Sequence, residues 1–198
     1  SFVAAPGEYD VEVIGQLEKD YAGKQESSVG STLSKKPTII VVMNESFADL
    51  SVIGELKTNE PLTPFVDSLT ENTVKGYALS SVFGAKTPNS EWEFLAGGSM
   101  AFLPSGSVVY QQYLNDTPST LVSTLKNEGY TCVAMHPYYE TGWSRNLVYP
   151  DLGFDESYFI DHFDQSQMIR EYISDEELYR KIIARYENRK VNEDLFIM

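Results

Sequence analysis

The segment 82–98, VFGAKTPNSEWEFLAGG, places the hydroxyl of Thr87 directly before a proline at the start of a predicted helix. A nucleophilic hydroxyl benefits from this position, because unpaired backbone N–H groups and the helix dipole stabilise an alkoxide and a bound phosphate. The same Thr-Pro pair begins ordinary helices, and it recurs at Thr63 and Thr117, where we expect no chemistry. From the pattern alone, Thr87 is either a helix cap or a nucleophile that a divalent cation must activate.

A carboxylate and an imidazole each follow a predicted strand. Glu45 comes soon after the apolar run TIIVVM, and His136 comes directly after YTCVAM. Ligands of open α/β sheets gather at the carboxyl ends of the strands, so Glu45 lies where a metal ligand or a catalytic carboxylate is expected. The alternative is that Glu45 caps the next helix or faces solvent, since carboxylates are seldom buried without a partner. Position alone favours neither interpretation.

Trp143 and Arg145 follow His136 within MHPYYETGWSRNLVY. The planar guanidinium group suits a phosphate, the tryptophan ring forms a flat wall, and the histidine offers a donor. Each residue also has an ordinary alternative: a strand cap for His136, core packing for Trp143, and a surface ion pair with Asp151 for Arg145. Together, at one strand edge, the three favour an anion site.

Strands and helices alternate along most of the chain. The runs TIIVVM and YTCVAM predict strands buried in a parallel sheet, and TVKGYALSSVF (73–83) predicts a further strand. Helices are predicted at the three Thr-Pro pairs, and another after Ser174, which forms a capping box with Glu177. This order predicts an α/β fold with a mostly parallel sheet flanked by helices.

The chain divides by composition into two parts. Residues 1–35 predict a lead-in helix, YDVEVIGQLEKDYAGK, followed by a Gly/Ser-rich linker. Residues 36–198 predict the N-terminal portion of a larger catalytic domain. The last run, EDLFIM, begins an apolar strand and stops at Met198, so we expect a fold truncated at its C-terminal end.

Composition excludes several classes of function. No apolar run approaches the roughly 18 residues of a membrane-spanning helix, and the only cysteine, Cys132, is expected to be a buried core residue. The chain carries 15 basic and 29 acidic residues, a net charge of −14, which repels polyanions and argues against nucleic-acid binding. An anionic substrate therefore needs a cation or a few basic residues that reverse the local field.

Taken together, IIVVMNESFADL, GAKTPNSEWEFLAGG and HPYYETGWSRNLVYPDLGFDESY resemble the extracellular catalytic domain of lipoteichoic acid synthases and related phosphoglycerol transferases. These enzymes form a sulfatase-like branch of the alkaline phosphatase superfamily, and the resemblance covers about residues 36–198. It implies a Mn²⁺ or Mg²⁺ ion held by Glu45 and Thr87, with Thr87 also the nucleophile. It further implies a glycerol-phosphate site lined by His136, Trp143 and Arg145.

In that family a downstream Asp-His pair completes the metal site. The dipeptide Asp161-His162 comes too soon after Arg145, so we interpret it as a coincidence in a connecting segment. The resemblance then places the missing pair beyond Met198. We therefore expect the 198-residue chain alone to be inactive.

The implied activity is that of a bacterial cell-envelope transferase, associated with the membrane through segments outside this chain and with its catalytic domain on the extracellular face. It would transfer glycerophosphate from phosphatidylglycerol to a glycolipid or glycan acceptor through a phospho-threonine intermediate. Sulfate-ester hydrolysis is disfavoured, because residues 87–90, TPNS, depart from the C/S-x-P-x-R pattern of sulfatases. A metal-dependent phosphodiesterase or sulfatase-like hydrolase and a non-catalytic binding module are the alternatives.

Overall fold

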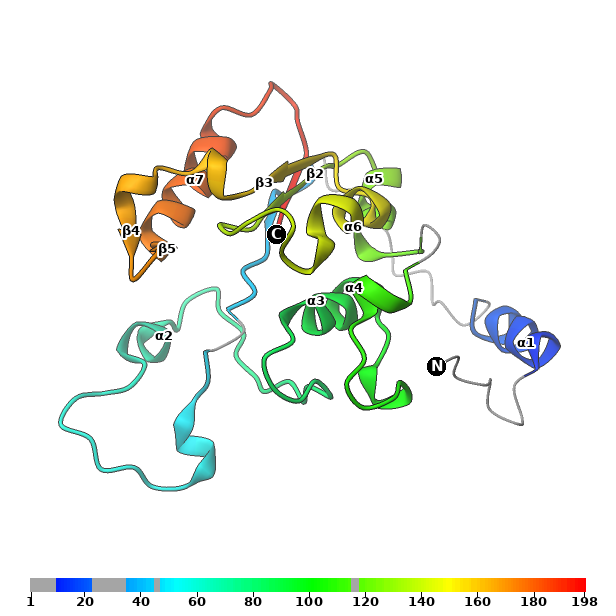
Figure 1. The fold of residues 1–198 in the computed structure, drawn as a ribbon, viewed down its shortest axis with the longest axis horizontal. Helices are drawn as coiled ribbons and strands as arrows, with labels where there is room; N and C mark the ends of the chain where they lie inside the picture. The colour runs from blue at the N-terminus through cyan, green and yellow to red at the C-terminus, as the bar shows by residue number, and fades with distance from the viewer. Residues whose placement is uncertain (1–9, 23–34, 45–46, 115–117) are drawn as a thin grey trace. The chain divides into compact units, whose positions relative to one another are not determined.

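The computed structural model describes residues 10–22, 35–44, 47–114 and 118–198 (Figure 1). The chain divides into two units, Ser1–Thr38 and Ile39–Met198. The first unit contains helix α1 (Val11–Ala22), which confirms the predicted lead-in helix. Most of the predicted linker lies outside the described residues. None of the helices within those ranges is long and apolar enough to cross a membrane.

The second unit is built on a four-stranded parallel sheet with the order β1-β6-β2-β3. Its strands are β1 (Ile39–Ile40), β6 (Leu195–Ile197), β2 (Thr131–Met135) and β3 (Glu156–Tyr158). Strand β6 comes last in the sequence but lies inside the sheet, paired with β1 on one edge and with β2 on the other. The predicted α/β fold with a mostly parallel sheet is therefore confirmed.

Alternating side chains of β2 divide the core into two layers. Cys132 and Ala134 belong to one hydrophobic cluster, whereas Val133 and Met135 belong to the other. Figure 1 shows α7 on one side of these strands and α5 and α6 on the other. The first cluster packs against α3 (Thr87–Ala96), α4 (Val109–Gln112), α5 (Leu121–Asn127) and α6 (Arg145–Leu152); the second packs against α7 (Asp175–Glu187).

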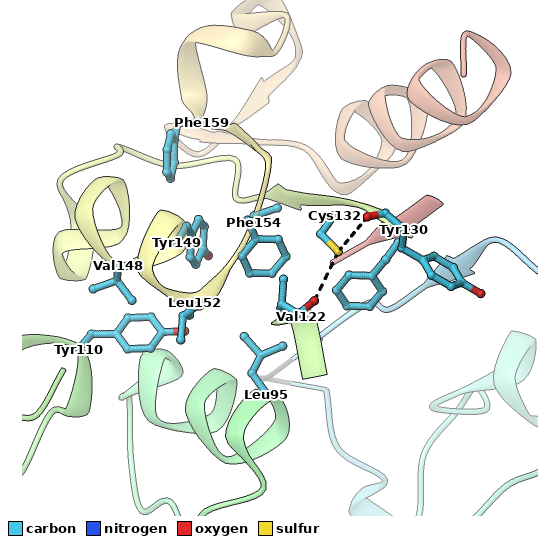
Figure 2. Close-up of a cluster of buried hydrophobic side chains, with 12 residues drawn as sticks. Leu95, Tyr110, Val122, Tyr130, Cys132, Val148, Tyr149, Leu152, Phe154 and Phe159 are labelled. Atoms are coloured by element: carbon cyan, nitrogen blue, oxygen red, sulfur yellow. Dashed lines mark hydrogen bonds between the residues drawn. The ribbon is translucent and has the colours of Figure 1, made fainter. Parts of the chain in front are cut away.

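Cys132 is a buried member of the first cluster, and Figure 2 shows its Sγ facing Val122 and Tyr130. Its Sγ is 3.7 Å from the carbonyl oxygen of Val122 and 3.9 Å from that of Tyr130. Burial raises the pKa of the thiol to about 11, so the thiol stays protonated at neutral pH. The prediction that Cys132 is a buried core residue is confirmed.

Short elements connect these layers. A two-stranded antiparallel hairpin, formed by β4 and β5, follows β3 in the sequence. The remaining elements are α2 (Pro64–Ser68), β4 (Met168–Ile169), β5 (Tyr172–Ile173), and the 3₁₀ helices η1 (Leu50–Ile53), η2 (Met100–Phe102), η3 (Gly142–Ser144), η4 (Ile160–His162) and η5 (Gln165–Gln167).

The prediction of a strand at residues 73–83 is wrong. This segment has no regular secondary structure, and the side chains of Val74, Leu79 and Phe83 are almost fully exposed, at 101%, 102% and 97%. An alternating apolar pattern forms a strand only where a neighbouring strand pairs with its backbone and a core covers one face. Neither is present at this segment in the described structure.

The run TIIVVM is also less buried than predicted. Only Ile39 and Ile40 form strand β1, and the backbone N–H of Val41 continues the pairing by donating to the carbonyl of Ile197 at 2.8 Å. Ile40 and Val42 are 45% and 44% exposed. The expectation of a strand buried on both faces is therefore wrong here, because the described elements cover only one face of β1.

Two of the predicted helix starts need correction. Thr87 is the first residue of α3 and Lys86 is the N-cap, so the prediction of Thr87 as the cap of this helix is wrong. Helix α5 begins at Leu121 instead of at the Thr117-Pro118 pair, of which Thr117 lies outside the described residues. Thr120 caps it, because its hydroxyl accepts from the N–H of Ser123 and donates to the carbonyl of Leu152. By contrast, α2 has Thr63 as N-cap and Pro64 in its first turn, as predicted.

Helix α7 has half of its predicted capping box. The hydroxyl of Ser174 accepts from the N–H of Glu177 at 3.3 Å, which confirms Ser174 as the N-cap. The Glu177 carboxylate, however, accepts from the N–H of Asp164 at 3.0 Å. It therefore joins α7 to the preceding turn.

Candidate active site

Thr87 is the first residue of α3, and Lys86 is the N-cap. Gly84 and Ala85, at φ 67° and 43°, both have the left-handed conformation and turn the chain into the helix. Asn89, two residues into the helix, fixes this end, because its side-chain amide donates to Ser107 O at 2.9 Å and accepts from Val109 N–H at 3.1 Å. The Thr87 hydroxyl thus lies in the first turn of an anchored ten-residue helix, where the helix dipole favours negative charge.

Thr87 lines a cavity of about 160 Å³ at the carboxyl ends of two strands. Residues 41–43, after β1, and 135–137, at the end of β2, form the sheet side of this cavity. This is the edge at which ligands of parallel sheets gather. The predicted metal ligand Glu45 lies outside the described residues, and Met43, two positions before it, lines this cavity with Thr87.

A second cavity, of about 590 Å³, brings together the other predicted site residues. Thr87, His136, Trp143 and Arg145 all line it. They come from the start of α3, the residue after β2, helix η3 and the start of α6. The fold therefore brings Thr87 together with three residues of the later segment 136–145 around one space.

His136 is held directly after β2. Its backbone N–H donates to the carbonyl of Tyr158 at 2.9 Å, which continues the pairing of β2 with β3. Burial, and then the positive charge of Arg145, lower the pKa of His136 to about 3. The imidazole is thus neutral at physiological pH and offers one donor and one acceptor nitrogen.

Arg145 is buried in an ion pair, with a side chain only 1% exposed. Its Nη2 lies 2.6 Å from Oε1 of Glu91, its Nε lies 3.4 Å from Oε2 of the same carboxylate, and its Nη1 donates to Gly142 O at 3.3 Å. The alternative of a surface pair with Asp151 is therefore wrong. The partner is Glu91, one turn after Thr87 on the same helix.

Two tyrosines complete the coordination of Glu91. The hydroxyls of Tyr110 and Tyr149 donate to its Oε2 at 3.0 Å and 3.4 Å. This carboxylate is therefore satisfied on both oxygens, as a buried charge requires. Glu91 is not among the residues predicted from the sequence, although its spacing of four residues from Thr87 places both on one face of the helix.

The backbone at Trp143 and Ser144 is strained. Both residues have left-handed conformations, with φ of 56° and 60°, which are uncommon for side chains larger than glycine. Arg145 follows immediately and is fixed by Glu91. The ion pair therefore holds a strained turn that places Trp143 at the wall of the larger cavity.

Asp161 and His162 lie in η4, after β3. Nδ1 of His162 accepts from the backbone N–H of Phe159 at 3.2 Å, and its ring packs edge-on against Tyr158. Neither residue lines a cavity that contains Thr87. This placement agrees with their interpretation as part of a connecting segment.

The residues predicted as metal ligands would supply part of a metal site. In the described parts of the chain, no group of three or more His, Cys, Asp or Glu residues could hold a metal ion. The two predicted donors, the Thr87 hydroxyl and the Glu45 carboxylate, are oxygen ligands of the kind that Mn²⁺ and Mg²⁺ prefer. The chemistry of these donors fits the expected ion, and further ligands are needed.

Comparison with known proteins shows the family to which the chain belongs. The sulfatase family model matches residues 37–198, so the chain belongs to the sulfatase family. A putative cyclic β-1,2-glucan modification protein of Rhizobium meliloti is 36% identical over 79% of this chain and 24% of its own length. A lipoteichoic acid synthase of Staphylococcus saprophyticus is 33% identical over 68% of this chain and 21% of its own length.

Among solved structures, the Streptococcus pyogenes phosphoglycerol transferase GacH in complex with sn-glycerol-1-phosphate matches with a TM-score of 0.77 and 21% identity. The match covers 98% of this chain and 52% of GacH. The match to GacH supports the α/β fold, and the curated relatives confirm the resemblance to lipoteichoic acid synthases. The chain spans about a quarter of the length of the two curated relatives.

Proposed function

We propose that this chain provides the nucleophile and part of the substrate site of a metal-dependent phosphoglycerol transferase. The observation that carries the proposal is that Thr87, at the N-terminus of α3, shares one cavity with His136, Trp143 and Arg145. A hydroxyl at a helix N-terminus beside an imidazole and a flat aromatic wall suits the binding and attack of a phosphodiester. The relatives named for lipoteichoic acid synthesis and for glucan modification support this class of chemistry.

The proposed reaction has two steps. Thr87 Oγ gives its proton to solvent and attacks the phosphorus of phosphatidylglycerol, so that a P–O bond forms to Thr87 while the P–O bond to diacylglycerol breaks and the diacylglycerol oxygen takes up a proton. An acceptor hydroxyl then attacks the phosphorus of the phospho-threonine and gives its proton to solvent, while the bond to Thr87 breaks and the Thr87 oxygen takes up a proton. A Mn²⁺ or Mg²⁺ ion, held by Glu45, Thr87 and further ligands, would lower the pKa of the threonine hydroxyl and neutralise charge on the phosphoryl oxygens.

The other residues that line the larger cavity have separate proposed roles in binding the glycerophosphate. His136, neutral because its pKa is lowered, would donate a hydrogen bond to the glycerophosphate without adding a second charge beside Arg145. Trp143 would pack against the glycerol carbons. The guanidinium group of Arg145 has most of its hydrogen bonds committed to Glu91 and Gly142, so its contribution would be chiefly its positive charge in a buried site.

The proposed acceptor is a glycan or a glycolipid. The relative with 36% identity is named for modification of a cyclic β-1,2-glucan, which favours a glycan. We place the catalytic domain on the extracellular face of a bacterial membrane, with the anchoring segments outside this chain. Because Glu45 and Thr87 would supply only part of the ligand set of the proposed metal site, we expect the 198-residue chain alone to be inactive.

The test measures diacylglycerol release from acyl-labelled phosphatidylglycerol by the full-length protein, with and without Mn²⁺. Thr87→Ala should reduce release to background, a loss of more than about 10²-fold, while far-UV circular dichroism stays unchanged. Thr63→Ala is the matched control, because Thr63 also precedes a proline at a helix start but contacts only the exposed Asp67. Near-normal release by Thr87→Ala would exclude Thr87 as the nucleophile. Free glycerophosphate without a modified acceptor would indicate a hydrolase.

A further inference from the structure

Three exposed tyrosines lie beside the larger cavity. The rings of Tyr138 and Tyr172 stack, with centroids 5.9 Å apart and planes at 24°, and the ring of Tyr139 packs edge-on against Tyr138 at 5.0 Å. Their exposed fractions are 37% for Tyr138, 57% for Tyr139 and 59% for Tyr172. We call these three residues the tyrosine platform. Tyr138 and Tyr172 line the cavity that contains Thr87, so the platform is continuous with the candidate active site.

The fold holds the platform from two separate segments. Tyr138 follows β2 and is fixed through its backbone, which donates to His136 O at 2.7 Å and accepts from Ile160 N–H at 3.0 Å. Tyr172 lies on β5, in the hairpin with β4. Local sequence does not bring these rings together. The ring of Tyr138 also packs edge-on against that of His136, with centroids 6.3 Å apart, so the platform is in direct contact with a residue of the candidate active site.

Exposed stacked rings offer a flat apolar face bordered by hydroxyl groups. The C–H bonds on one face of a sugar ring pack against such a surface, while its hydroxyls exchange hydrogen bonds with the phenol groups and with water. Tyrosine suits this contact because it has a large rigid surface and few torsions to immobilise. An exposed aromatic patch beside a cavity is a common sign of a binding surface.

Charge favours a neutral ligand. The chain carries a net charge of −14. Glu140 directly follows Tyr139, and Glu171 directly precedes Tyr172, whereas Arg170 is the one arginine or lysine within two positions of these tyrosines in the sequence. This field repels a polyanion or an anionic membrane surface but does not affect an uncharged glycan. Ile169, 64% exposed on the same hairpin, makes membrane contact the main rival.

We infer that the tyrosine platform is an acceptor subsite, which binds a sugar ring of a neutral glycan and places one of its hydroxyls at the entrance of the cavity that contains Thr87. This inference rests on the proposed function for the identity of the reaction. The bound hydroxyl would form the new P–O bond of the second step as the bond between phosphorus and Thr87 breaks. The platform contributes position and specificity for the acceptor, and it takes no part in cleavage of the donor.

The first test is direct binding, which needs no turnover. Full-length protein is titrated calorimetrically with neutral β-1,2-linked glucose oligosaccharides, as wild type, Tyr172→Ala, Tyr172→Trp and Tyr179→Ala. We expect Tyr172→Ala to weaken binding about five- to tenfold and Tyr172→Trp to retain it. Tyr179, on α7, is 46% exposed and lines neither cavity that contains Thr87, so Tyr179→Ala is the control for loss of an exposed tyrosine. Equal affinity of wild type and Tyr172→Ala, or no binding by wild type, would overturn the inference.

The second test separates acceptor binding from the proposed function and from membrane contact. Tyr172→Ala should raise the KM for the oligosaccharide about five- to tenfold, whereas the control Tyr179→Ala should leave both this KM and diacylglycerol release without acceptor unchanged. If wild type releases no diacylglycerol, the proposed function fails, while the calorimetric result still decides the platform. Co-sedimentation with phosphatidylcholine vesicles, with or without phosphatidylglycerol, tests the rival. Weaker sedimentation of Tyr172→Ala with an unchanged oligosaccharide affinity would assign the platform to the membrane and overturn the inference.

Discussion

Two arginines of this chain bind carboxylates in different surroundings. Arg145 and Glu91 are almost completely buried, with side chains 1% and 7% exposed, between α3 and α6. Arg185, on α7, binds Glu156 and Glu193 at 2.9 Å and 2.8 Å, and the side chains of Arg185, Glu156 and Glu193 are 13%, 35% and 8% exposed. The first pair lies at the wall of the candidate active site, and the second lies outside the cavities that contain Thr87.

The difference lies in what each pair does for the fold. Removing two charges from water costs several kcal/mol per ion, so a buried pair adds little net stability compared with apolar residues of the same volume. Its geometry is nevertheless fixed, because any rearrangement would leave a charge unsatisfied. The Glu91–Arg145 pair joins the helix that carries Thr87 to the strained turn that carries Trp143. We therefore assign the Glu91–Arg145 pair a positioning role, and we expect the Arg185 cluster to act mainly on stability.

The largest effect is expected for Glu91→Gln. The substitution keeps the shape but leaves the Arg145 charge buried without a partner, so we expect a loss of about 3–5 kcal/mol in the free energy of unfolding. Denaturant titration of the full-length protein measures this change. Glu93→Gln, on the same helix, is the matched control, because Glu93 accepts from the Met100 N–H and the Ser81 hydroxyl and forms no ion pair with an arginine in the described parts of the chain.

A double substitution distinguishes positioning from stability. Adding Arg145→Met to Glu91→Gln removes the unpaired charge, so part of the lost stability should return. Diacylglycerol release by the double variant should nevertheless stay well below that of the wild type, because α3 and the Trp143 turn are no longer joined. Full recovery of release together with stability would show that the pair does not position the candidate site.

An intermediate effect is expected at the Arg185 cluster. Hydrogen bonds from Arg185, with a smaller contribution from Lys190, lower the pKa of Glu193 from 4.5 to about 2. A carboxylate whose pKa is lower in the folded state stabilises the fold above its unfolded pKa, and this stabilisation is lost as the pH falls from about 4.5 towards 2. Glu193→Gln should therefore cost about 2 kcal/mol at pH 7 and unfold with a shallower dependence on pH between 5 and 3. An unchanged pH dependence would contradict this role.

The sequence predicted those elements whose patterns are local. Helix α1, strand β2 and helix α7 follow from periodicity and caps, and they appear where expected. The grouping of Thr87, His136 and Trp143 followed from a general rule, that strands of a parallel sheet end at one edge, together with the family resemblance. The roles assigned to these residues stay predictions.

Other features depend on partners that a linear pattern does not contain. Glu91 appeared as one carboxylate in an acidic turn, and only the packing of α3 against α6 gives it Arg145, Tyr110 and Tyr149 as neighbours. The segment 73–83 has strand-like alternation but no pairing strand among the described residues. Tyr138 and Tyr172 likewise come together through the position of the β4–β5 hairpin.

The smallest effect is expected for an exposed pair on α7, and it sets the scale for the others. Arg180 Nη2 lies 2.5 Å from Glu176 Oε1, closer than the corresponding atoms of Arg145 and Glu91, but the two side chains are 55% and 78% exposed. Water screens these charges and holding two long side chains costs entropy, so Glu176→Gln should change the free energy of unfolding by less than about 1 kcal/mol. The same denaturant titration measures it. A loss as large as that of Glu91→Gln would mean that distance, and not burial, sets the energy of these pairs, and the contrast between the candidate site and the rest of the fold would disappear.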